Sequence, residues 1–179
     1  GMSFGGFSTA AALEARDPRV KAAIMKCPSI SVSGTGTLHT SRKDLNTPVM
    51  VMLGKEDTVI GDAGNAAGRE YVQTHQGPAY LAEVVRGGHV SFTSCELYNP
   101  AYGNGIGESK SLTNPGESYT PLDIVEQHKM INSYGLAFLN THLRADFAGE
   151  AGSAASASYN ADYLKENRFG DDELVYLAK

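Results

Sequence analysis

Residues 1–6 of this 179-residue chain read GMSFGG, and residues 7–16, FSTAAALEAR, follow them as an expected helix. The pattern G-x-S-x-G in front of a helix is typical of a nucleophile elbow, a sharp strand-to-helix turn that exposes a serine. Gly1 and Gly5 flank this serine, and we expect both positions to be crowded, because a larger side chain there would collide with neighbouring backbone. Ser3 is therefore a candidate nucleophile. The alternative is that Ser3 is an ordinary helix N-cap.

A candidate acid and a candidate base follow Ser3 in the chain. A serine hydroxyl is a poor nucleophile until a base removes its proton, so both are needed. Residues 48–53, PVMVML, form an apolar run of strand length, and the turn after them, GKEDTVI, carries Asp57. Residues 80–85 form a second expected strand, which leads through RGG to His89. Because ligand chemistry in open α/β sheets collects at the carboxyl ends of the strands, we expect Asp57 and His89 to meet there.

With these three motifs, the chain resembles the C-terminal half of an α/β-hydrolase. The elbow GMSFGG, the acid turn GKEDTVI and the histidine loop GGHVSFT occur in the order of that superfamily, with 89 − 57 = 32 residues between acid and base. The branch that it looks closest to is the dienelactone hydrolase-like and platelet-activating factor acetylhydrolase-like group, which also resembles bacterial polyester hydrolases and cutinases. The resemblance covers residues 1 to about 143.

The resemblance implies an α/β fold, in which helices flank a parallel sheet. It also implies that this chain holds only the C-terminal half of that fold and lacks its N-terminal strands. It also implies that the loop which usually supplies half of the oxyanion hole is absent, so that the backbone N–H of Phe4 is the donor that the sequence offers. A tetrahedral intermediate normally uses two donors. We therefore expect the chain alone to be a poor catalyst, and we expect the missing N-terminal half or self-association to cover the open sheet.

Strands and helices are expected to alternate, which predicts a parallel sheet covered by helices. In chain order, the expected elements are a helix over 7–16, strands over 20–26 and 49–53, a helix over 64–75, a strand over 80–85, a short helix from Val90, and an amphipathic helix over 121–143 with Pro121 in its first turn. The apolar positions of the helix over 121–143 include Val125.

Two segments stand apart from this pattern. Residues 94–120 form a polar loop insertion within the expected catalytic half, 1–143; it either borders a substrate cleft or is simply solvated. Residues 144–179 begin with a stretch rich in alanine, glycine and serine and end in a tail. We expect that tail to form a short helix or to pack on the missing half.

The function that the resemblance implies is that of a serine hydrolase, which cleaves carboxylic esters through a Ser3–His89–Asp57 triad and an acyl-enzyme intermediate. Met2 and Phe4 flank the nucleophile and give the expected substrate site an apolar floor. No cofactor is needed. Two alternatives remain open: a serine peptidase that resembles the catalytic domain of prolyl oligopeptidase, and a non-catalytic hydrolase fragment.

Composition excludes several other classes. The net charge of −5, with dispersed lysines and arginines, argues against nucleic acid as a partner. No stretch approaches eighteen apolar residues, so the sequence predicts no membrane span.

Metal and disulfide chemistry receive little support from the sequence. No H-E-x-x-H motif is present, and we predict no metal site; Glu56 is expected to be an exposed neighbour of Asp57. Cys27 and Cys95 either form a disulfide near the carboxyl edge of the sheet or remain unpaired. A disulfide between these cysteines would indicate an oxidising compartment. The localisation is therefore unknown, with a weak lean to a periplasmic or secreted protein.

Overall fold

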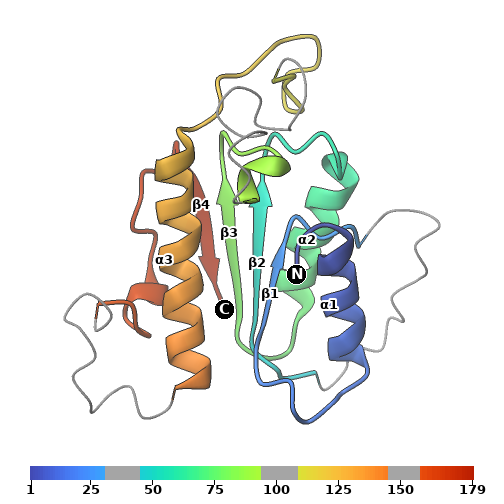
Figure 1. Ribbon diagram of the computed structural model, residues 1–179, viewed down its shortest axis with the longest axis vertical. Helices are drawn as coiled ribbons and strands as arrows, with labels where there is room; N and C mark the ends of the chain where they lie inside the picture. Colours follow the sequence, from blue (N-terminus) through green and yellow to red (C-terminus); the bar gives the residue numbers. More distant parts are fainter. Residues whose placement is uncertain (31–44, 94–108, 145–157) are drawn as a thin grey trace.

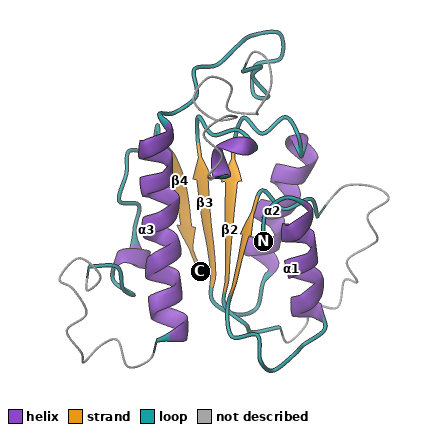
Figure 2. Ribbon diagram, in the orientation of Figure 1, coloured by secondary structure: helices purple, strands orange, loops and turns teal. Residues whose placement is uncertain are grey.

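The computed structural model describes residues 1–30, 45–93, 109–144 and 158–179. A four-stranded sheet lies at its centre, in the order β1-β2-β3-β4, and helices flank the sheet (Figures 1 and 2). Successive side chains of a strand point to opposite faces of the sheet. The contacts of Met52 and Leu53, which are adjacent in β2, therefore show which face of the sheet each helix covers. Gly68 of one helix packs on Leu53, and Gly135 of another packs on Met52. The chain therefore forms an α/β sandwich with a helix on each face.

The first three strands are parallel, as the sequence predicts. They are β1 (Ala23–Lys26), β2 (Val49–Gly54) and β3 (Ala79–Val84), and Val49 pairs with Ala23 on one side and with Ala79 on the other. All six residues of β2 are buried, in keeping with its central position between two neighbours.

The expectation of an all-parallel sheet is wrong at the other edge. The tail forms β4 (Leu174–Ala178), which pairs antiparallel with β3 through Val84 and Leu174. It is neither the short helix nor the tail packed on a missing half that we expected, although a 3-10 turn, η3 (Tyr163–Lys165), precedes it. The pairing is favoured because β4 buries Leu174 completely and supplies hydrogen-bond partners to β3, which would otherwise form a bare edge.

β1 is also shorter than the expected strand over 20–26. Asp17 holds the preceding chain in a tight turn, because its side chain accepts from Arg19 N–H at 2.9 Å and its carbonyl accepts from Val20 N–H at 3.0 Å. The chain reaches the sheet only at Ala23, whose N–H donates to Pro48 O.

In the described ranges, three α-helices cover the sheet: α1 (Phe4–Glu14), α2 (Gly61–Thr74) and α3 (Ile124–Leu143). Pro121 lies outside α3, not in its first turn, because Asp123 caps the helix by accepting from Val125 N–H and Glu126 N–H. Val125, one of the expected apolar positions, is 68% exposed and does not dock on the sheet. The short helix expected after His89 is the 3-10 turn η1 (Val90–Phe92).

The described part of the tail packs on α3. The Tyr134 ring stacks on Tyr176 of β4 at a centroid distance of 4.5 Å and meets Tyr163 of η3 edge-on at 5.3 Å. Tyr134 Oη also donates to Glu166 O. Residues 158–179 therefore share one packed unit with the sheet. Of the helices in the described ranges, none has the length and apolar character needed to cross a lipid bilayer.

Candidate catalytic site

The turn after β2 presents Asp57 at the carboxyl edge of the sheet. Its carboxylate is fully buried, and Oδ1 accepts hydrogen bonds from Val59 N–H at 2.9 Å and from Ile60 N–H at 3.0 Å. Asn65 of α2 anchors the turn from behind by donating its amide to Gly54 O at 3.0 Å. The orientation of the carboxylate is thus fixed by backbone donors on one side of the group, which leaves Oδ2 for another partner.

That partner is His89. The distance from His89 Nδ1 to Asp57 Oδ2 is 2.7 Å, and only 7% of His89 is exposed. Because the carboxylate accepts, the proton of the neutral imidazole is assigned to Nδ1, which makes Nε2 the basic nitrogen. A buried carboxylate that orients the imidazole in this way fixes the tautomer in which Nε2 can accept a proton.

Contacts with η1 and α3 hold the loop that carries His89. Ser91 Oγ donates to Gly88 O at 2.6 Å and accepts from Gly88 N–H at 3.1 Å. Gln127 of α3 donates its side-chain amide to the same hydroxyl at 2.7 Å. The loop is therefore tied to two elements, although its glycines would permit many conformations.

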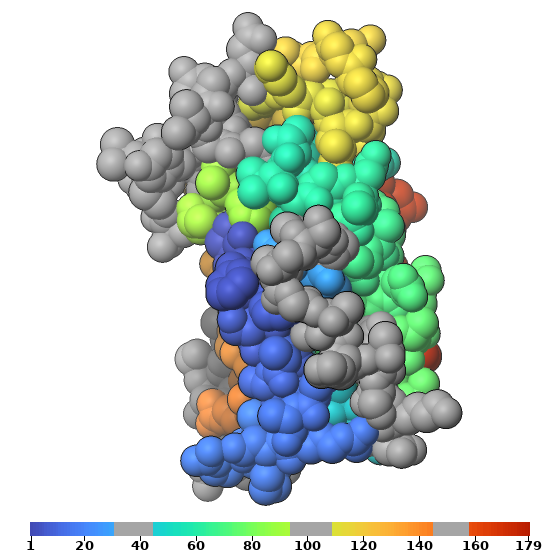
Figure 3. Space-filling view, turned by 90° about the vertical axis from the view of Figure 1, so that its right-hand side faces the viewer, coloured from blue at the N-terminus to red at the C-terminus, as the bar shows by residue number. Residues whose placement is uncertain are grey.

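Glu56 is not the exposed neighbour that the sequence suggested, because only 6% of it is exposed. Its Oε2 accepts from Leu112 N–H at 2.6 Å and from Ser111 Oγ at 3.0 Å, and its Oε1 accepts from Thr113 Oγ1. Burial, the largest single influence, opposes ionisation, but the hydrogen bonds from Thr113, Leu112 and Ser111 outweigh it and lower the Glu56 pKa. Residues 109–120, yellow in Figure 3, lie beside the turn after β2.

Ser3 occupies the turn between the first residues and α1. Its backbone has φ 54° and ψ −122°, a strained conformation for a residue with a side chain. Ser3 N–H donates to Lys26 O at 2.9 Å, and Met2 forms a parallel bridge with Lys26, so the segment before α1 runs beside β1. The hydroxyl lies 3.4 Å from Ser29 Oγ. The structure thus joins Asp57 to His89 and places Ser3 at the end of β1; a hydrogen bond between Ser3 and His89 remains a prediction.

The glycines of the elbow differ in their surroundings. A Cβ on Gly1 would lie 2.1 Å from Gly5 O, so the first position is crowded as expected. The expectation is wrong for Gly5, around which a Cβ would meet nothing within 4 Å. Crowding falls instead on Gly6, where a Cβ would lie 2.7 Å from Pro28 Cβ. The second close approach therefore lies one residue later than the motif suggests.

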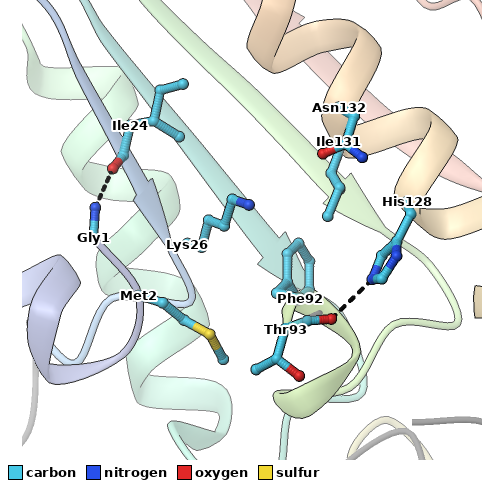
Figure 4. A pocket seen from close by; sticks show the side chains of 9 residues that line it. All are labelled: Gly1, Met2, Ile24, Lys26, Phe92, Thr93, His128, Ile131 and Asn132. Atoms are coloured by element: carbon cyan, nitrogen blue, oxygen red, sulfur yellow. Dashed lines mark hydrogen bonds between the residues drawn. The ribbon is translucent and has the colours of Figure 1, made fainter. Parts of the chain in front are cut away.

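Met2 and Phe4 flank Ser3 but point to different places. Met2 lines a pocket of about 590 Å³ between β1, η1 and α3, together with Lys26, Phe92 and His128 (Figure 4). Phe4 is 59% exposed and stacks on Phe7, away from that pocket. As the first residue of α1, Phe4 has an N–H without an intrahelical acceptor, as an oxyanion donor requires.

Cys27, directly after β1, lies beside the acid and the base. Its Sγ, a carboxylate oxygen of Asp57 and a ring nitrogen of His89 all lie within 4.8 Å of one another. A cysteine sulfur, a carboxylate oxygen and an imidazole nitrogen are all ligand types that zinc accepts. Burial, the charge of Asp57 and a hydrogen bond with its carboxylate raise the Cys27 pKa well above its usual value. At neutral pH the Cys27 thiol is therefore protonated.

Cys27 is free, so it does not form the disulfide with Cys95 that the sequence left open; Cys95 itself lies outside the described residues. Of the other histidines, His75 is buried and contacts Thr47 O through Nε2 at 2.9 Å. His39 lies outside the described residues.

Several residues around the site were not predicted. The sequence placed Cys27 near this sheet edge, because it follows a strand that ends there, but only as a candidate for a disulfide and not as a neighbour of Asp57 and His89. Gln127 and Ser111 had none: a polar residue in an amphipathic helix or a polar loop is normally solvated, and only the fold shows that these two are buried.

Comparison with known proteins gives no further assignment. No protein-family model, no curated protein and no solved structure matches the chain.

Proposed function

We propose that this chain carries the catalytic residues of a serine hydrolase acting on carboxylic esters, within a domain of the α/β-hydrolase type. Ser3 is the nucleophile, His89 the general base and Asp57 the acid that orients the base. The observation that carries the proposal is the buried hydrogen bond between His89 Nδ1 and Asp57 Oδ2, at 2.7 Å. It is supported by the strained backbone of Ser3 on a strand-to-helix turn beside the same sheet.

The proposed reaction follows from the roles of these groups. His89 Nε2 takes the proton of Ser3 as the hydroxyl attacks the ester carbonyl, and Asp57 stabilises the imidazolium that forms. Phe4 N–H donates to the oxyanion of the tetrahedral intermediate. His89 then protonates the leaving alcohol. In the second half of the reaction, His89 takes a proton from the water that attacks the acyl-enzyme and returns a proton to Ser3 Oγ as the carboxylic acid is released.

The pocket lined by Met2 supports an ester of modest size. Its lining includes the apolar Ile24, Phe92 and Ile131 together with Lys26 and His128. It lies between Met2, which precedes Ser3, and the turn η1, which follows His89. An acyl chain in contact with these side chains would be removed from water, which favours apolar over highly charged substrates.

Covalent labelling of the whole chain tests the proposal. A fluorophosphonate should add one group to the wild-type protein, and peptide mapping should place it on Ser3. Ser29→Ala provides the matched control, because its hydroxyl is the neighbour of Ser3 at 3.4 Å. We expect Ser3→Ala to abolish labelling and hydrolysis of p-nitrophenyl butyrate, and Ser29→Ala to retain labelling. Label on Ser29, or equal labelling of the wild type and Ser3→Ala, would contradict the assignment.

A further inference from the structure

The pocket lined by Met2 combines apolar walls with a charged side chain. It holds about 590 Å³, and Ile24, Phe92 and Ile131 form apolar parts of its wall. Lys26 of β1 lies among them, and its side chain extends toward α3 (Figure 4). The pocket therefore offers apolar surface and a cationic group to the same ligand.

The place of Lys26 follows from the geometry of β1. Successive side chains of a strand point to opposite faces, so Ile24 and Lys26 share one face, while Ala23 and Met25 share the other and are buried. Ile24 and Lys26 are half-buried and line the pocket. The carbonyl of Lys26 accepts from Ser3 N–H at 2.9 Å, so this wall of the pocket begins next to the proposed nucleophile.

The ammonium of Lys26 has no carboxylate partner in the described part of the chain. None of the described residues that line the pocket is acidic, and none of the ion pairs among described residues includes Lys26. A half-buried charge between apolar walls loses part of its hydration, so an anion that enters gains more from it than it would in open solution. The charge balance therefore favours a negatively charged ligand.

Two other polar residues on the pocket wall leave this charge as it is. His128 Nε2 donates to Thr93 O at 2.9 Å, because a carbonyl oxygen only accepts, and this contact holds the ring at the end of η1. Asn132, the neighbour of Ile131, adds a neutral amide to the same wall. Neither side chain carries a negative charge, so the ammonium of Lys26 stays available to a ligand.

We propose that this pocket binds an apolar carboxylate, whose charged end pairs with Lys26 and whose hydrocarbon part packs on Ile24, Phe92 and Ile131. Such a ligand matches both properties of the pocket, because its hydrocarbon leaves water while its carboxylate meets the ammonium. Two sources share this chemistry: a free carboxylic acid, and an ester substrate with a carboxylate at its far end, such as a half-ester of a dicarboxylic acid. Binding of the anion follows from the pocket alone, whereas turnover of a half-ester rests on the proposed function.

Binding to the whole chain is measured with 4-phenylbutyrate and with 4-phenylbutanamide, which has the same shape but no charge. We expect the wild type to bind the carboxylate about tenfold more tightly, the scale of one hydrogen bond to a charged group. In NMR spectra, the methyl signals of Ile24 and Ile131 should shift, and that of Ile60, the N-cap of α2 and no part of the pocket wall, should not. Equal affinity for the two compounds would overturn the proposal, because Lys26 would then only cover apolar surface and keep its ammonium in water.

Three variants separate charge from packing. Lys26→Met removes the ammonium and keeps an unbranched side chain, and Lys26→Arg keeps the charge. Lys129→Met is the matched control, because it removes an exposed charge of α3 that pairs with Glu126 at 3.5 Å. We expect Lys26→Met to weaken the binding of 4-phenylbutyrate about tenfold, and the other two variants to retain the preference for the carboxylate.

A preference for the carboxylate that persists in a folded Lys26→Met protein would show that another group binds the anion, and would contradict the assignment. If Lys26→Met does not melt cooperatively, the comparison of carboxylate with amide in the wild type still decides.

Hydrolysis distinguishes the two sources of the carboxylate. Mono-p-nitrophenyl esters of succinate, glutarate and adipate are compared with p-nitrophenyl butyrate as ratios of kcat/KM. For a half-ester substrate, Lys26→Met should lower this ratio about tenfold, and Lys129→Met should leave it unchanged. An unchanged ratio together with Lys26-dependent binding of 4-phenylbutyrate assigns the pocket to a free acid and excludes the half-ester. Binding of the carboxylate by a chain that hydrolyses none of these esters would reject the proposed function and leave the anion site intact.

Discussion

At the scale of single residues, Gly5 and Gly6 are neighbours with opposite surroundings. A Cβ on Gly5 would enter open space, whereas a Cβ on Gly6 would meet Pro28 at 2.7 Å from its Cβ and 2.8 Å from its Cα. Because Pro28 Cα belongs to the backbone, this clash cannot be relieved by a rotamer change.

We therefore expect Gly6→Ala to lower the free energy of unfolding by about 1–3 kcal/mol, the usual range for overpacking. Gly5→Ala is the matched control. It should be neutral or stabilise α1 by up to about 1 kcal/mol, because alanine favours the helix. Urea denaturation of both variants measures the difference; equal destabilisation would show that Gly6 does not pack on Pro28.

Glu56 gives a second prediction, which depends on pH. Its folded-state pKa is lowered, so its contribution to stability is present above the unfolded glutamate pKa of about 4.3 and is lost as the pH falls through the folded value. Glu56→Gln keeps the shape but turns an amide group toward the N–H donors of residues 112 and 113. We expect a loss of about 1–3 kcal/mol at pH 7.

The difference between wild type and Glu56→Gln should shrink below about pH 4, where the unfolded glutamate is protonated. Chemical denaturation at a series of pH values measures it, and the exposed Glu70→Gln serves as the control. A difference that stays constant down to acidic pH would mean that packing, and not charge, gives Glu56 its effect.

The sequence predicted the contact between Asp57 and His89, because both follow strands and parallel strands bring their ends together whatever the details of packing. It failed for Glu56 for a physical reason: the donors that make its burial tolerable lie 55 to 57 residues away in a polar loop. Nothing local distinguishes such a buried carboxylate from an exposed one.

At the scale of elements, β4 completes the sheet beside β3. Leu174 is fully buried, while Val175, the next residue, is 42% exposed. We expect Leu174→Ala to cost about 2–4 kcal/mol of stability through the cavity that it leaves, and Val175→Ala to cost less than about 1 kcal/mol. Thermal unfolding of the two variants measures this contrast. Similar losses for both would mean that β4 contributes through its backbone pairing alone.

The sequence predicted the elements with long apolar runs or clear helical patterns, and it missed β4. Five residues, LVYLA, are too short to separate a strand from a helical turn, and their partner β3 ends 90 residues earlier (174 − 84). The start of α3 was misplaced for a local reason, since Asp123 competes with Pro121 as the start signal and the side-chain cap prevails.

At the scale of the whole molecule, α3 carries an apolar stripe on its outer face. Leu136, Leu139 and Leu143 are spaced by three and four residues, so they share one side of the helix, and each is 38–51% exposed. Such a stripe promotes association between copies in solution.

We expect the double substitution Leu136→Lys and Leu143→Lys to reduce self-association, measured as the weight-average mass by light scattering over a range of protein concentrations. Val59→Lys is the control, because it adds a charge at another exposed apolar position, 58% exposed. An unchanged mass in the double variant, or an equal fall in the control, would exclude the stripe as the contact surface.

The pairing of β3 with β4 also affects how the protein is made. A ribosome adds about 5–20 residues per second, so the 90 residues between Val84 and Leu174 take about 5–18 s to synthesise (174 − 84 = 90). Throughout that time β3, which leads to His89, has one side without its strand partner, whereas local collapse takes microseconds. The nascent chain therefore carries an open strand edge for a time much longer than local collapse takes. A chaperone that covers extended apolar segments during this time would raise the yield of native protein.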